Sequence, residues 1–142
     1  MSEPVLDAAA LQEILAAAFP GAEIPVVESV DAAQVSVSLP VGPHHVRPGG
    51  TLSGPAMMML ADTAAWCAVM SQVGPVVLAV TTSLHIDFLR RPPLDDVVAK
   101  THLLKLGRRL AVIEVAITSR ATDDLVAKAQ VTYSIPPGAS LA

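Results

Sequence analysis

Hydrophobic and polar positions follow two different periods along the chain. Near the N-terminus, apolar residues recur every three or four positions and the run ends at Pro20-Gly21, which predicts a short amphipathic helix. From Ile24 to Leu39 the period becomes two, with a break near Asp31, which predicts a strand pair or one bent strand. Residues 41–50 read VGPHHVRPGG, and these prolines and glycines predict a loop. The apolar positions of the first helix are Leu6, Leu11, Ile14, Leu15, Ala18 and Phe19.

A long helix is predicted over residues 55–72. Ser53 suits the capping position of a helix N-terminus, Pro55 suits the first helical position, and Gly74-Pro75 ends the run. The segment is apolar nearly all round, which is typical of a helix wrapped by other structure. Its stretch TLSGPAMMMLADTAAW nevertheless contains one carboxylate, Asp62.

Strand-like runs follow this helix, and the breaks between them, RRPPLDD, KLGRR and RATDD, are short. Short breaks favour antiparallel neighbours joined by hairpins. Residues 1–142 are therefore predicted to form one α+β domain, with a helix within 1–22, a central helix and antiparallel strands over 76–136. The expected architecture is a sheet curled round a buried helix. The strands are predicted at Val76 to Phe88, Val97 to Leu106, Leu110 to Ser119 and Leu125 to Ile135.

The composition adds an expectation about partners. With 52% hydrophobic and 15% charged residues, the chain is globular and more apolar than a free-standing monomer usually is, so we expect part of its surface to meet another subunit. A net charge of -4 disfavours a nucleic-acid surface. The acidic N-terminus lacks the features of a secretory signal, and the apolar stretch Pro55 to Met70 is shorter than the ~20 residues of a membrane span. We therefore expect a cytoplasmic protein without membrane contact, in keeping with a single cysteine, Cys67.

Three segments carry a resemblance to a known family. GTLSGPAMMMLADTA, VTTSLHIDFLRRP and GRRLAVIEVAI with the later LVAKAQVTYSI resemble the hotdog-fold acyl-CoA thioesterases of the phenylacetic-acid-degradation type, over roughly residues 40 to 136. The resemblance implies a hotdog fold, a homodimer with a continuous sheet that often pairs into a homotetramer, and hydrolysis of acyl-CoA thioesters. It also implies no metal and no cofactor, because CoA is part of the substrate.

The resemblance assigns roles to three positions. Gly54 matches the glycine whose backbone N–H polarises the thioester carbonyl, Asp62 the acid that acts as nucleophile or as general base, and Thr81 a hydroxyl that helps to hold the water. The chain departs from the family at Arg47, Ser53 and Pro55, which replace an asparagine, a histidine and a glycine. Arg47 and Ser53 therefore occupy positions that assist substrate binding, and substrate class or rate is expected to differ.

The same chemistry follows from the residues. A helix N-terminus offers unpaired N–H groups and partial positive charge, which would stabilise an oxyanion, and glycine permits close approach. Burial of an unpaired carboxylate is costly and makes such a group a stronger base. Gly54 and Asp62 lie ~12 Å apart on one helix, too far to act on one carbonyl. We therefore expect Gly54 of one subunit to face Asp62 of another.

Further residues are expected at the substrate. Met58, within three consecutive methionines, and Trp66, one turn past Asp62, are predicted to line an acyl pocket, although such residues are more often core. The basic residues gather between positions 90 and 109, where guanidinium groups would suit the phosphates of CoA. Arg90, Arg91 and Arg108 are the predicted contacts, and solvated hairpin ends are the plainer explanation.

Several alternatives stay open on sequence grounds. Asp62 could be a structural acid bonded to backbone or to Thr63. A metal site is disfavoured because His44 and His45 are adjacent and lack further ligands, and the serine-nucleophile motif is out of register at Ser53. The main rivals to an enzyme are an acyl-CoA binding module with a decayed site and a purely structural oligomer. The acyl group itself is not specified.

Overall fold

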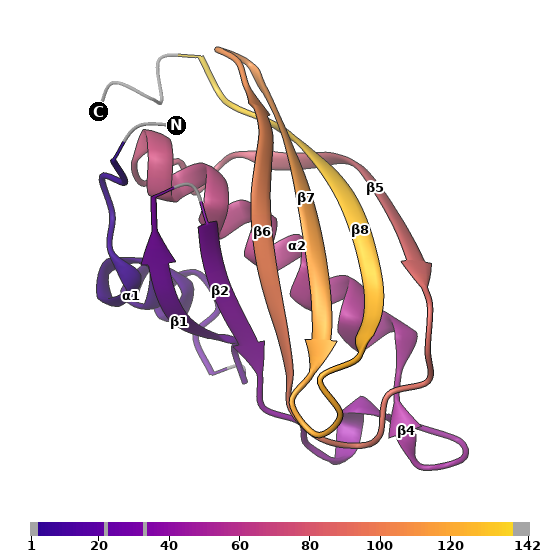
Figure 1. Ribbon diagram of the computed structural model, residues 1–142. Coiled ribbons are helices and arrows are strands. Elements are labelled where there is room, and N and C mark those ends of the chain that lie inside the picture. The colour runs from indigo at the N-terminus through magenta and orange to yellow at the C-terminus, as the bar shows by residue number, and fades with distance from the viewer. Residues whose placement is uncertain (1–2, 22, 33, 138–142) are drawn as a thin grey trace.

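The computed structural model describes residues 3–21, 23–32 and 34–137, in which a six-stranded antiparallel sheet curls round one long helix (Figure 1). This arrangement confirms the predicted α+β architecture. Residues 1, 2 and 22 of the predicted N-terminal segment lie outside the described residues. The elements are α1 (Ala8–Ala18), β1 (Val26–Asp31), β2 (Gln34–Leu39), the 3-10 helix η1 (Pro43–His45), β3 (Val46–Arg47), β4 (Thr51–Leu52), α2 (Gly54–Val73), β5 (Val80–Phe88), β6 (Val97–Leu106), β7 (Leu110–Ser119) and β8 (Leu125–Ser134).

The strands of the large sheet lie in the order β1-β2-β6-β7-β8-β5. The predicted hairpins between β6 and β7 and between β7 and β8 are confirmed. The hairpin predicted across RRPPLDD is wrong, because β6 pairs with β2 and β7 on its two sides, and β5 pairs with β8 at the edge. The segment after β5 therefore crosses one end of the sheet to reach β6 (Figure 1).

Two boundaries also differ from the prediction. Strand β5 begins at Val80 rather than Val76, because residues 76–79 form a turn in which the Ala79 N–H donates to the Val76 carbonyl at 2.9 Å. The loop predicted over 41–50 contains η1 and β3, and β3 pairs with β4 just before α2. A bridge between Thr51 and Pro93 ties this small two-stranded sheet, just before α2, to the connection between β5 and β6.

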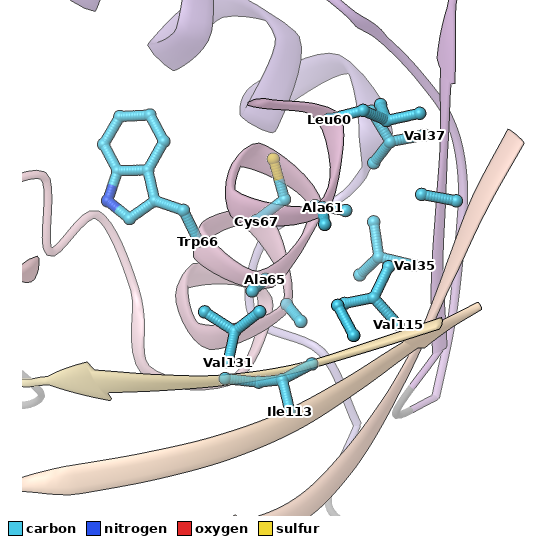
Figure 2. Packing of buried hydrophobic residues seen from close by; sticks show 14 of the residues in the cluster. Val35, Val37, Leu60, Ala61, Ala65, Trp66, Cys67, Ile113, Val115 and Val131 are labelled. Carbon is cyan, nitrogen blue, oxygen red and sulfur yellow. The ribbon is translucent and has the colours of Figure 1, made fainter. Parts of the chain in front are cut away.

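Helix α2 is the centre of the core. Figure 2 shows Ala61 and Ala65 turned toward the sheet, where Val35, Val115 and Val131 meet them, while Trp66 points to the other side of the helix. Small residues on the inner face let the helix approach the sheet closely, and the covering strands bury most of its circumference. Among the described residues α2 is the one helix long and apolar enough to cross a membrane, yet 72% of that window is buried within the fold. Its burial, rather than its length, marks it as a core helix.

Helix α1 is fixed against the first strand of the sheet. Leu11 and Leu15 are fully buried, and the Gln12 side chain donates to the Pro25 carbonyl at 3.1 Å and accepts from the Val27 N–H at 2.7 Å. These bonds satisfy backbone groups of the adjoining chain and tie the helix in place. Phe19, the residue that caps the C-terminal end of α1, has a side chain that is about half exposed.

Candidate active site

The N-terminus of α2 presents one free backbone donor. Ser53 caps the helix, as predicted, and its Oγ accepts the Ala56 N–H at 3.2 Å. Pro55 has no N–H, and the Met57 N–H donates to the Ser53 carbonyl. Among the described residues the Gly54 N–H has no hydrogen-bond partner. The partial positive charge of the helix end is therefore concentrated at Gly54.

A cavity of about 290 Å³ opens beside Gly54. Its walls combine apolar residues with three arginines, Arg47, Arg90 and Arg91. The Phe88 ring lies 3.4 Å from the place where a Cβ on residue 54 would stand, so Gly54 sits directly against the end of β5. One nitrogen of the Arg90 guanidinium group is already hydrogen-bonded within the chain, because Nη1 donates to the Leu125 carbonyl at 2.9 Å. This end of the molecule is suited to an anionic ligand that approaches the helix start.

Two turns further along α2, Asp62 is held by two hydroxyl groups. Oδ1 accepts from Thr81 Oγ1 at 2.6 Å and from the Tyr133 hydroxyl at 2.7 Å. The same tyrosine oxygen also lies 3.1 Å from the Asp62 carbonyl oxygen. Oδ2 has no hydrogen-bond partner in the described part of the chain. The carboxylate is half-buried, not fully buried and unpaired as the sequence led us to expect.

The strand register explains how the two hydroxyls meet one carboxylate. Thr81 and Tyr133 are direct cross-strand partners of β5 and β8. A β-bulge follows at Thr81/Ser83, so that Thr81 faces α2 although the residues after it resume the regular alternation. Bulges commonly re-aim a side chain in this way. Asp62 is therefore positioned by its neighbours on the sheet, not by Thr63, whose hydroxyl contacts Met59 Sδ at 3.7 Å.

Tyr133 is the site residue that sequence reasoning missed. It is the only tyrosine in the chain, and strand alternation places it on the inner face, where a buried hydroxyl needs a partner. A lone tyrosine at an inward-facing strand position was therefore the sequence feature that could have indicated a role for Tyr133. Burial is the main cause that raises the pKa of Tyr133 well above its ordinary value, and the negative charge of Asp62 adds to it. Tyr133 therefore remains a hydrogen-bond donor at neutral pH.

This shift gives a titration that can be read directly. Because Tyr133 is the only tyrosine, tyrosinate absorbance in the near ultraviolet reports on it alone. We expect no ionisation near pH 10, the ordinary value for tyrosine, while the protein is folded. Since the folded state keeps the proton, this contribution to stability is fully present below about pH 10 and is lost as the pH rises past it. Asp62→Asn should move the titration to lower pH, and a folded wild type that titrates near pH 10 would contradict the assignment.

The structure divides the predicted residues between separate places. Asp62, Thr81 and Trp66 line one cavity of about 360 Å³, whereas Gly54 lines the other with Arg47, Arg90 and Arg91. Both Gly54 and Asp62 belong to α2, as predicted, eight residues apart. One chain therefore does not bring the free amide and the acid together.

The other predicted contacts lie outside these two cavities. Met58 is exposed on α2 and lines neither cavity. Ser53 faces a third hollow with His44 and His45. Arg108 lies in the turn between β6 and β7, at the opposite end of the sheet from Arg90, so the basic residues of 90–109 form no single patch within one chain. A substrate role for these three residues stays a prediction.

Other nucleophiles and metal ligands are not assembled in the described residues. Burial raises the pKa of the Cys67 thiol to about 12, so a thiolate nucleophile is absent at neutral pH. No group of three or more His, Cys, Asp or Glu side chains in the described ranges could hold a metal ion.

Comparison with known proteins places this geometry in a family. A family model described as the thioesterase superfamily matches residues 49–127, which include α2 and the strands β5, β6 and β7. The chain belongs to the thioesterase superfamily. Its sheet and central helix are the hotdog fold of that superfamily, which confirms the fold predicted from the resemblance.

Solved structures agree with this assignment. A candidate thioesterase from Silicibacter sp. TM1040 is 36% identical, with 95% of each chain covered and a TM-score of 0.84. A mutant of the phenylacetic acid degradation protein PaaI from Thermus thermophilus is 27% identical over 80% of this chain and 95% of its own, with a TM-score of 0.70. The protein smu.793 from Streptococcus mutans UA159, bound to acetyl CoA, shares the fold at 22% identity over 84% of this chain and 94% of its own, with a TM-score of 0.73.

Proposed function

We propose that this thioesterase-superfamily protein hydrolyses acyl-CoA thioesters at a site formed between two of its subunits. The observation that carries the proposal is the pair of groups on α2, the free Gly54 N–H and the hydroxyl-bound carboxylate of Asp62. An amide donor and a carboxylate are the parts that thioester hydrolysis requires, the first to stabilise an oxyanion and the second to activate water or attack the carbonyl.

The separation of these groups requires a second chain. Both must come within about 3 Å of the reacting atoms, yet eight helical residues separate them by ~12 Å along the axis. Residue 58 is the midpoint between 54 and 62. A two-fold axis beside Met58, across two antiparallel α2 helices, would place each Gly54 opposite the partner's Asp62 and form two identical sites.

The exposed surface fits such a partner. Along α2 the residues that escape burial form one strip, and the adjoining strand β5 has a free edge and is exposed along most of its length. A second copy that pairs with this edge would continue the sheet and cover the strip. The exposed apolar residues of this strip, of β5 and of the segments next to β5 are Pro55, Met58, Met59, Val77, Leu78, Val80, Phe88 and Leu89.

The proposed reaction uses each observed contact. Thr81 and Tyr133 donate to Oδ1 and fix the carboxylate, while Oδ2 stays available to take a proton from water or to attack the thioester carbon. The carbonyl oxygen gains negative charge against the partner's Gly54 N–H. The C–S bond then breaks and the CoA thiolate leaves. Where Asp62 acted as base, it returns its proton to the thiolate; where it attacked the carbonyl, water hydrolyses the resulting anhydride, which restores the carboxylate, and the acid formed supplies the thiolate with its proton. Arg47, Arg90 and Arg91 surround the Gly54 cavity, where CoA phosphates would find complementary charge.

The family and the acetyl-CoA complex of smu.793 support CoA esters as the substrate class. Thiol release from a panel of CoA esters with short, long and aromatic acyl groups tests the activity. Calorimetry with the same esters is the companion measurement, because binding without thiol release would favour a binding module over an enzyme. No hydrolysis and no binding would overturn the proposal.

A further inference from the structure

An apolar cavity lies next to the Asp62 cavity, and the side chains of two residues, one of them aromatic, line both. This smaller cavity, of about 180 Å³, lies beneath the end of α1 and is lined by Leu15, Phe19, Glu23, Ile24, Pro25, Met59 and Thr63. Only Phe19 and Thr63 also line the Asp62 cavity. We refer to it as the α1 cavity.

The geometry points to Phe19 as the residue that sets acyl-chain length, with a neutral straight-chain acyl group as the substrate class. This inference rests on the proposed acyl-CoA hydrolysis.

The Phe19 side chain lies at the boundary of the two cavities. Its ring meets Trp66 edge to face, with the centroids 6.0 Å apart and the planes at 70°. The backbone is fixed, because the Phe19 N–H donates to the Leu15 carbonyl at 3.0 Å and α1 is tied down by Gln12. The side chain itself is 49% exposed. The ring can therefore be replaced without disturbing the helix.

Contact with Trp66 holds the Phe19 ring in place. The indole N–H of Trp66 is buried and has no hydrogen-bond partner among the described residues. A buried donor without a partner is unfavourable. The edge-to-face contact with the Phe19 ring partly offsets that cost and favours the observed position of the ring.

The residues that line the α1 cavity determine which kind of acyl chain it can bind. Its walls are mostly hydrocarbon, and the Thr63 hydroxyl is turned to Met59 Sδ. Glu23 stands at the rim, its side chain exposed and paired with His44 at 3.3 Å, while Asp62 stands in the neighbouring cavity. Carboxylates at both places disfavour an acyl tail that ends in a carboxylate. A neutral aliphatic chain fits this environment.

Phe19→Ala joins the two cavities and should shift specificity toward longer chains. Each further methylene that the joined cavity buries is worth roughly fourfold in kcat/KM. We therefore expect the ratio of kcat/KM for dodecanoyl-CoA to that for butyryl-CoA to rise at least tenfold, and Phe19→Trp to lower the same ratio. A dodecanoyl chain with a terminal carboxylate should not share the gain. The ratio is measured within each variant, so it does not depend on the fraction of folded protein.

Leu104→Ala is the matched control, because Leu104 is 45% exposed and lines neither cavity. Its ratio should equal that of the wild type. An unchanged ratio in both Phe19 variants, with wild-type hydrolysis intact, would overturn the chain-length role and leave the proposed function standing. A wild type that releases no thiol from any CoA ester would instead contradict the proposed function itself.

Discussion

Asp62→Asn should abolish turnover while the protein stays folded. Loss of a general base lowers rates by about 10²- to 10⁴-fold, and loss of a nucleophile would lower them further. The amide of asparagine has nearly the same shape, and its oxygen can still accept from Thr81 and Tyr133, which hold Oδ1 in the wild type. We therefore expect cooperative unfolding to persist. The measurement is kcat/KM for the best CoA ester, together with thermal unfolding followed by circular dichroism.

The control makes the same chemical change elsewhere. Asp31 is an exposed aspartate at the end of β1, on the edge of the sheet opposite β5. Asp31→Asn removes one negative charge without touching either cavity, so its kcat/KM should match the wild type. Undiminished hydrolysis by the folded Asp62→Asn protein would remove Asp62 from the mechanism and make it a structural acid.

The helices and strands could be predicted because each depends on the residue pattern of its own short segment. Ser53 and Pro55 mark the start of α2, and its apolar circumference identifies a core helix. The strand order could not be predicted in this way. The connection after β5, residues 89–96, is short enough to suggest a hairpin, and only the packing of β2 against β6 decides that β5 lies on the far edge. Strand pairing depends on contacts between distant segments, about which the length of a connection says little.

The same distinction between local and long-range features applies to the residues of the candidate site. Gly54 and Asp62 could be predicted from one helix, because their spacing along α2 is fixed by helical geometry. The role of Tyr133 could not, because it depends on the register that sets Tyr133 opposite Thr81 and on the bulge that turns Thr81 inward. The expected dry, unpaired acid proved to be a half-buried acid with two donors. Its position is therefore maintained by hydrogen bonds as well as by burial.

Two inactive variants should restore activity when they share a dimer. Gly54→Pro removes the free N–H, and proline is accepted at the first helical position because Ser53, with φ -76° and ψ 151°, is already extended. Loss of one oxyanion donor costs about 10²- to 10³-fold in kcat. Gly54→Ala is the matched control, since it keeps the N–H and its Cβ meets Phe88 at an ordinary 3.4 Å.

Mixing Gly54→Pro and Asp62→Asn chains in equal amounts tests whether the site is shared. A mixed dimer holds one site that lacks both groups and one that is complete, so random assortment should restore roughly a quarter of the wild-type activity. The reverse mixture is equally informative. Wild type assorted with a chain that carries both substitutions should keep roughly a quarter of the activity, because every site in a mixed dimer is broken. If each chain held its own complete site, the first mixture would stay inactive. The second mixture would then keep roughly half of the wild-type activity, because half of its chains are wild type.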